Sequence, residues 1–427
     1  MKGFGSSNEK AKKSIKTADT LKKDQLISNA LSLHSKGKIK EASEIYNYLI
    51  QNKIYDPRVF NNLGSIYSQI KQFDKAILLF NESIKKFPNS LEAYSNLASI
   101  LVIKGRSDTA KNILKKAIEL NPNNLKPYSN LAGIYVGDGN FKEAEILLRK
   151  SLDINPKDIN TLVNLACVMK DLGNLKDAEK FLKDALEINP LYEPSLTNLG
   201  SVLNELEKID EGERYLRKAL NINPASHMAQ NNLGNILSKK RNYSESEFCY
   251  RKAIEKKSDF SLAYNNLGSL LSRQGKLIEA EELTEKAIVY NPKFELAYVN
   301  LGTIKIDLDK SSEAEELFLS AIEINKNYNY AYSNLFRLYE KTNNLNKLKT
   351  KIESLKENKN IINEILMFKA RISFREKDFK MAKALIDQVS NDWLKNTDHS
   401  TNLLYWSFKA FIEEKVKNYD EAFKCFE

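Results

Sequence analysis

The sequence has 427 residues, of which 42% are hydrophobic and 29% are charged, and this is the balance of a folded protein and not of a disordered one. No apolar run approaches the roughly 18 residues of a membrane-spanning helix, and we expect no secretory signal and no membrane insertion. Three cysteines, Cys167, Cys249 and Cys425, are too few and too far apart for a disulfide framework. We therefore expect a reducing, cytoplasmic setting.

The chain opens with a basic segment. Residues 1–23 carry seven lysines against Glu9 and Asp19, and we expect residues 1–22 to form a flexible, solvated tail. A periodic pattern begins after it, with Ala30, Ala42 and Tyr46 as the landmarks of a first unit over about residues 23–56.

A repeat of 34 residues follows without insertion through most of the chain. Its most regular feature is an asparagine followed by leucine and, in eight of nine cases, by glycine or alanine. These asparagines are Asn62, Asn96, Asn130, Asn164, Asn198, Asn232, Asn266, Asn300 and Asn334. We number each repeat so that this asparagine is position 6.

Each repeat predicts two helices. Positions 4, 7, 8 and 11 follow the spacing of one amphipathic helix, and positions 20, 24 and 27 follow that of a second. Position 8 is glycine or alanine and position 20 is usually alanine, whereas position 24 is large. Small residues let the two helix axes approach closely, and large ones fill the space between them. Glycine is frequent at position 15, and an Asn-Pro pair often ends the second helix.

The pattern becomes irregular toward the end of the chain. Phe336 and Leu348 replace the small residues of positions 8 and 20 in the tenth unit, and a six-residue insertion falls within residues 391–400. We therefore divide the chain into a regular part, 23–340, and a degenerate part, 341–427, that ends inside a repeat. Phe423 and Phe426 would then lie on an uncovered helix. This predicts either self-association through that end or a longer parent protein, and we favour the second.

The landmark residues resemble the tetratricopeptide repeat, a helix–turn–helix unit of 34 residues. The resemblance implies an all-α fold, a right-handed α-solenoid of about eleven to twelve units. It also implies that the first helix of each unit lines a concave groove, with positions 2, 5, 6, 9, 12 and 13 pointing into it.

Residues for catalysis or metal binding are not grouped in the sequence. The three histidines, His34, His227 and His399, fall in different units, and Gly137-Asp138-Gly139 lacks the lysine of a phosphate loop. We expect this chain to have no enzymatic activity, no metal and no cofactor.

The row of nine asparagines is the best candidate site. In the groove it would form a ladder whose amides match the donors and acceptors of an extended peptide, similar to the asparagine ladder of the O-linked N-acetylglucosamine transferase superhelix. The alternative is structural, because asparagine at this position can also brace neighbouring helices. The lysine at position 5 by which related clamps bind chaperone tails is missing, so we do not expect such a ligand.

The net charge of +10 does not indicate a nucleic-acid partner, because only 11 of the 66 basic residues are arginine. The sequence thus predicts a protein-interaction scaffold that binds an extended peptide. The alternative is the recruiting arm of a larger transferase, since long bacterial arrays of this kind precede sulfotransferase or O-linked N-acetylglucosamine transferase-like domains. Assembly of a membrane complex is a third possibility without a specific residue behind it. Heavy use of Lys, Asn and Ile suggests a bacterial source.

Overall fold

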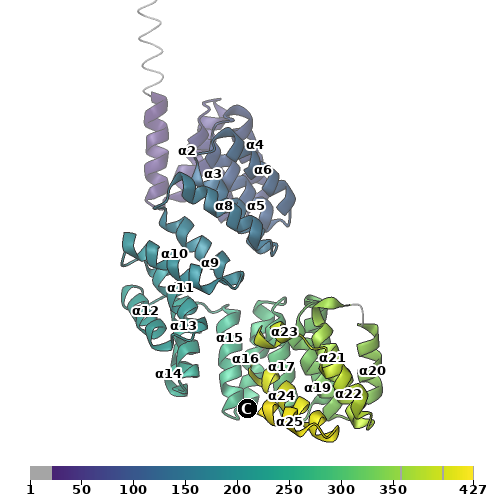
Figure 1. The fold of residues 1–427 in the computed structure, drawn as a ribbon. Coiled ribbons are helices and arrows are strands. Elements are labelled where there is room, and N and C mark those ends of the chain that lie inside the picture. The colour runs from purple at the N-terminus through teal and green to yellow at the C-terminus, as the bar shows by residue number, and fades with distance from the viewer. Residues whose placement is uncertain (1–21, 356–357, 397–398, 427) are drawn as a thin grey trace, which may run out of the picture. The chain divides into compact units, whose positions relative to one another are not determined.

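A computed structural model describes residues 22–355, 358–396 and 399–426 of the chain (Figure 1). The predicted N-terminal tail lies outside the described residues, apart from Lys22. Every regular element in these ranges is a helix, and the predicted all-α solenoid class is confirmed. The chain divides into two compact units, the first ending at Tyr215 and the second beginning at Leu216.

The first unit alternates between the two helices of each repeat, which we call the A helix and the B helix. Residues 22–35 are helical and belong to the first A helix. The further A helices are α3 (Pro57–Gln69), α5 (Leu91–Ile103), α7 (Leu125–Gly137), α9 (Ile159–Asp171) and α11 (Glu193–Glu205). The B helices are α2 (Ile39–Gln51), α4 (Phe73–Lys86), α6 (Ser107–Leu120), α8 (Phe141–Ile154) and α10 (Leu175–Ile188), and α12 (Ile209–Ile222) contains the division between the units. Successive A helices from α3 to α11 contact one another, and we call the surface that they line the A-helix face.

The second unit continues the alternation. Its A helices are α13 (His227–Lys239), α15 (Ser261–Arg273), α17 (Glu295–Asp307), α19 (Asn329–Lys341), α21 (Ile362–Arg375) and α24 (His399–Lys415). Its B helices are α14 (Tyr243–Lys256), α16 (Leu277–Tyr290), α18 (Ser311–Ile324), α20 (Leu345–Ser354), α22 (Phe379–Ile386) and α25 (Tyr419–Phe426). A 3-10 turn, η1 (Lys359–Ile361), precedes α21, and the short helix α23 (Asn391–Asn396) lies in the predicted insertion.

The turn between the A and B helices has the same backbone in all twelve repeats. Position 15 has a positive φ in every one, whether it is glycine, as at Gly105 (φ 73°), or not, as at Glu207 (φ 58°) and Lys417 (φ 65°). A left-handed residue ends the A helix and redirects the chain into the B helix. The glycines of the sequence therefore mark only some of the turns that share this conformation, since side chains other than glycine tolerate it at a cost.

Positions 8 and 24 are matched in size across the two helices of a repeat. A Cβ atom on Gly64 would lie 2.6 Å from the Phe80 ring, and one on Gly302 would lie 2.5 Å from the Phe318 ring. In the three repeats that have Ala98, Ala132 and Ala166 at position 8, position 24 is leucine, as at Leu114, and these side chains are buried. An aromatic ring thus replaces the missing methyl group and keeps the interior filled.

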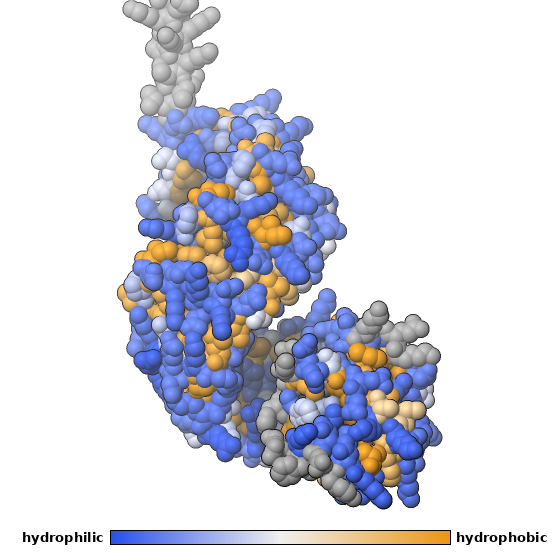
Figure 2. All heavy atoms as spheres, in the orientation of Figure 1, coloured by the Kyte–Doolittle hydropathy of each residue, from blue (hydrophilic) through white to orange (hydrophobic). Residues whose placement is uncertain are grey.

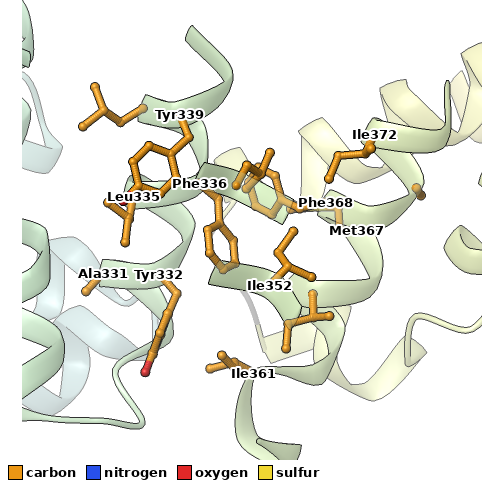
Figure 3. Close-up of a cluster of buried hydrophobic side chains, with 14 of the residues drawn as sticks. Ala331, Tyr332, Leu335, Phe336, Tyr339, Ile352, Ile361, Met367, Phe368 and Ile372 are labelled. Carbon is orange, nitrogen blue, oxygen red and sulfur yellow. The ribbon is translucent and has the colours of Figure 1, made fainter. Parts of the chain in front are cut away.

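The tenth repeat shows how the core accommodates a large residue at position 8. Phe336 is fully buried, and its ring lies edge-on to that of Phe368 with 5.1 Å between the centroids. Leu348 and Ile352 from α20 join the same cluster (Figure 3). In this repeat a large residue of the A helix, Phe336, takes part in the filling of the interior that position 24 of the B helix provides elsewhere.

The face of the molecule drawn in Figure 2 is mainly hydrophilic, with hydrophobic residues among the hydrophilic ones. In the described ranges, no helix has the length and apolar character that crossing a membrane requires. The side chains of Phe423 and Phe426, on which the predicted uncovered end depends, lie outside what the structure describes.

Candidate functional site

All nine asparagines of position 6 lie on A helices. Eight of them are half-buried, and Asn164 is exposed. Their hydrogen bonds, however, divide them into three groups. Asn62 and Asn334 donate to the main-chain carbonyls of Arg58 and Tyr330, four residues earlier in their own helices, at 2.7 and 2.8 Å.

Four successive asparagines of the first unit form the second group. Asn96, Asn130, Asn164 and Asn198 lie on α5, α7, α9 and α11. In the ranges 22–355, 358–396 and 399–426, none of these four amides has a hydrogen-bond partner within the protein. Their donors and acceptors are therefore available at the A-helix face.

Two adjoining pockets lie beside these amides. The first has a volume of about 340 Å³ and opens between α5 and α7. The second has a volume of about 190 Å³ and opens between α7 and α9. Leu114 contributes to the lining of the first and Leu148 to that of the second, and both leucines are buried position-24 residues of B helices. Asn130 borders the first pocket and Asn164 the second.

Gly133 lies at the point where the two pockets meet, since it lines both of them, as does Ser129. A Cβ atom added to Gly133 would have no heavy atom within 4 Å. Most other repeats have serine, threonine or asparagine at this position 9. The missing side chain therefore leaves open space on the A-helix face, in contrast to Gly64 and Gly302, whose missing side chains are replaced by a ring.

The third group belongs to the second unit, where asparagines bind one another across α13, α15 and α17. Asn266 Nδ2 donates to Asn231 Oδ1 at 3.0 Å and to Asn235 Oδ1 at 3.1 Å. Asn300 Nδ2 donates to Asn265 Oδ1 at 2.8 Å. Asn231 and Asn265 are buried, at 0% and 1% exposure. These amides therefore join neighbouring A helices, and Asn232 Oδ1 accepts from Asn231 Nδ2 at 3.5 Å within α13. We call Asn231, Asn232, Asn235, Asn265, Asn266 and Asn300 the amide network.

Tyr250 connects the amide network to a B helix. Its hydroxyl donates to Asn235 Oδ1 at 2.7 Å, and the side chain is 3% exposed. Burial raises the pKa of Tyr250 to about 12, so the phenol is neutral at physiological pH and remains a donor. The tyrosine occupies position 24, where the first unit has Leu114 and Leu148 beneath its pockets.

Position 5 differs from its prediction. It was expected to point into the groove, but it is buried in eight of the nine repeats and only half-buried at Ser129. Asn231 and Asn265 at this position accept hydrogen bonds from the next A helix, and Asn61 accepts one from Ser83 on the B helix α4. Ser129, the residue at this position that remains accessible, is also the one that lines both pockets.

Among the described charged groups near the second pocket, Lys170 has an ion-pair partner and Asp171 has none. Lys170 Nζ lies 3.0 Å from Glu205 Oε1 and donates to Ser201 Oγ at 3.1 Å. Asp171 lines the second pocket and has no ion pair among the described residues. Its pKa is raised, mainly by partial burial. Burial likewise raises the pKa of Cys167, which lines the same pocket as a neutral thiol.

Metal-binding groups and accessible histidines would be further sources of chemistry among the described residues. No group of three or more His, Cys, Asp or Glu side chains in those residues is arranged to hold a metal ion. His34 lies against Tyr46 and His227 against Phe260, so these two rings pack on aromatic side chains. The side chain of His399 lies outside the description.

Sequence reasoning included the asparagines but missed Gly133 and Asp171 as functional candidates. A signal was present for Gly133, because it is the one glycine in the row of position 9 from Ser65 to Thr303. Asp171 lies at position 13, which the resemblance placed in the groove, but the residue at this position varies from repeat to repeat and the pairing of Lys170 with Glu205 is visible only in the structure.

Comparisons with known proteins agree with the repeat architecture. Models of the tetratricopeptide repeat match residues 57–89, 91–124, 123–190, 193–226, 229–259, 249–282 and 296–328, which together make up more than half of the chain. No curated protein matches the sequence.

Solved structures resemble the fold. A tetratricopeptide repeat protein from Parabacteroides merdae is 25% identical with a TM-score of 0.49, and the match covers 58% of this chain and 98% of that one. Yeast Tom70 is 15% identical with a TM-score of 0.51 over 93% of this chain and 97% of its own. A human IFIT1 dimer with PPP-AAAA is 18% identical with a TM-score of 0.54 over 93% and 87%. The last two likenesses concern the fold alone. From the repeat models that match it, the chain belongs to the tetratricopeptide repeat family.

Proposed function

We propose that this protein is an interaction scaffold that holds an extended peptide segment of a partner on the A-helix face of its first unit. The observation that carries the proposal is the group of Asn96, Asn130, Asn164 and Asn198, four successive amides without a hydrogen-bond partner among the described residues. Each amide has two N–H donors and a carbonyl acceptor, which match the main-chain groups of an extended peptide.

Recognition of this kind depends on the peptide main chain and therefore tolerates many side chains. The pockets beside Asn130 and Asn164 add apolar surface at which part of the bound segment leaves water. The amide network of the second unit is excluded from the proposed site, because its donors and acceptors already bind one another.

The proposal is tested with a random peptide library displayed on phage and selected on the full chain. A selected peptide is synthesised with a fluorophore, and its dissociation constant is measured by fluorescence anisotropy. We expect the double variant Asn130→Ala/Asn164→Ala to weaken binding at least about tenfold, because two hydrogen bonds to the peptide are worth about 1 kcal/mol each.

The matched control is Asn81→Ala/Asn112→Ala. These two asparagines are exposed on the B helices α4 and α6 and have no hydrogen-bond partner among the described residues. The control should bind the peptide like the parent, with an unchanged helical circular-dichroism signal in both variants. Equal affinity of the two double variants, or a library without any binding peptide, would contradict the proposal.

A further inference from the structure

The two pockets of the first unit are lined by different kinds of side chain. The lining of each pocket therefore indicates which side chain of a bound peptide it would accept. Aliphatic groups dominate the first pocket, where buried Ala98, Leu114 and Ile134 and the more exposed Val102 line the space together with Gly133. A pocket of about 340 Å³ with this lining suits an aliphatic side chain. A charged side chain would lose its hydration in this pocket without an ion-pair partner to replace it.

The second pocket differs by having a carboxylate at its edge. Asp171 lines it together with Val136 and Leu148. The neighbouring cation, Lys170, is already bound to Glu205 and Ser201. Asp171, Glu205 and Lys170 together leave a net negative charge at this pocket, and this charge is complementary to a lysine or arginine of a ligand.

We propose that the segment held by the first unit carries an aliphatic side chain in the pocket between α5 and α7 and a lysine or arginine whose charged group pairs with Asp171. This inference rests on the proposed function and adds the chemistry of the partner. In an extended chain, side chains two residues apart project from the same side. The preferred ligand thus has an aliphatic residue and a basic residue separated by one residue.

The probes are capped synthetic peptides with a serine and threonine host sequence and two guest positions. Guest one is Leu or Ala, and guest two is Lys, Gln or Glu, at spacings of one, two and three residues. We expect the Leu and Lys peptide with one intervening residue to bind the full chain best. Replacing Leu by Ala should weaken binding about tenfold, and replacing Lys by Glu about fivefold.

Two variants test each pocket separately. Gly133→Leu places a side chain where a Cβ meets no neighbour, so the fold should be retained, and the preference for Leu over Ala should disappear. Asp171→Lys should reverse the preference from Lys to Glu, while Asp171→Asn should abolish it. A thermal unfolding midpoint at or above that of the parent checks that Gly133→Leu is folded.

The outcomes separate this inference from the proposed function. Peptides that bind through the four asparagines without a preference for Leu or Lys would overturn the inference and leave the proposed function standing. A preference for Lys that persists in Asp171→Lys would overturn it as well. If no host peptide binds, and the library also contains no binder, both fall.

Discussion

Asparagines at the same repeat position have different neighbours in the two units of this protein. In α5 to α11 the amides of position 6 have no protein partner among the described residues, whereas Asn266 and Asn300 in the second unit bind asparagines of the preceding A helix. The residues beside the pocket-lining amides also differ from those beside the amide network. The first unit has Gly133 at position 9 and Leu148 at position 24, and the second has Asn235 and Tyr250.

The asparagine at position 6 therefore has different hydrogen-bond surroundings in different repeats, although its place in the repeat is the same. Asn231 and Asn235 accept hydrogen bonds from Asn266, which thereby braces neighbouring helices. Beside Asn130 and Asn164, where a buried leucine of the preceding B helix forms part of the lining, a pocket opens instead. Of the two alternatives that the sequence left open, the structural one describes Asn266 and Asn300, and peptide contact by the four asparagines of the first unit stays a proposal.

The largest effect that sharpens this comparison is on stability. Asn266→Ala removes the two hydrogen bonds that its Nδ2 donates and the long one that its Oδ1 accepts from Asn265, and it leaves the carbonyl of buried Asn231 without its donor. We therefore expect a loss of about 3 kcal/mol in the free energy of unfolding. Asn164→Ala removes an exposed side chain without a partner among the described residues, so its effect should stay within about 0.5 kcal/mol.

Urea unfolding measures both variants, and amide hydrogen exchange shows where the change occurs. Faster exchange should be confined to α13, α15 and α17 in Asn266→Ala. Similar losses for the two variants would break the comparison, because they would mean that the two groups of asparagines have equal structural roles.

A second experiment asks whether the units differ in general packing and not only at the A-helix face. Gly64→Ala in the first unit and Gly302→Ala in the second each place a Cβ within 2.6 Å of a phenylalanine ring. Both should lose about 2 kcal/mol by urea unfolding. Gly133→Ala is the control, and it should gain up to about 1 kcal/mol since alanine favours the helix and meets no neighbour. Markedly unequal losses would show that core packing also separates the units.

The smallest effect concerns the tyrosine that anchors the amide network. Tyr250→Phe removes one hydrogen bond to Asn235 and should cost about 1 kcal/mol at neutral pH. The pKa of Tyr250 is raised to about 12 from its ordinary value of 10.0. Its contribution to stability is therefore complete below pH 10 and is lost as the pH rises through 12.

The parent should consequently lose stability more steeply than Tyr250→Phe when unfolding is followed upward from pH 9. Parallel pH profiles of the two proteins would mean that the phenol ionises as easily in the folded protein as in the unfolded one. That result would contradict the claim that buried Tyr250 stabilises the amide network as a neutral donor.

The repeat architecture was predictable because it depends on periodic spacing, and positions 8, 20 and 24 carry that spacing in nearly every repeat. The turn at position 15 was predictable only where it is glycine, because residues such as Glu207 adopt the same positive φ without a sequence signal. The predicted border at 340 marks where the pattern loses regularity. The compact units, in contrast, divide at Tyr215 and Leu216, within a stretch where the pattern is intact.

For the candidate site, the sequence predicts which repeat position carries the asparagines but not the hydrogen-bond partners of each one. The partners of each amide depend on residues about 30 positions away in sequence, such as Asn231 and Asn235 for Asn266, and periodicity alone does not decide whether they are close enough to bind. The predicted link to a sulfotransferase or glycosyltransferase domain stays a prediction, as do self-association and the bacterial and cytoplasmic setting.

The most direct test of the central claim is the side-chain amide spectrum of asparagine, recorded by nuclear magnetic resonance on the full chain labelled with nitrogen-15 at asparagine. Signals are assigned by single Asn→Ala variants, and the phage-selected peptide is then added. We predict shifts for Asn130 and Asn164 and unchanged signals for Asn266 and Asn300. Shifts of Asn266 and Asn300 with unchanged Asn130 and Asn164 would contradict the account.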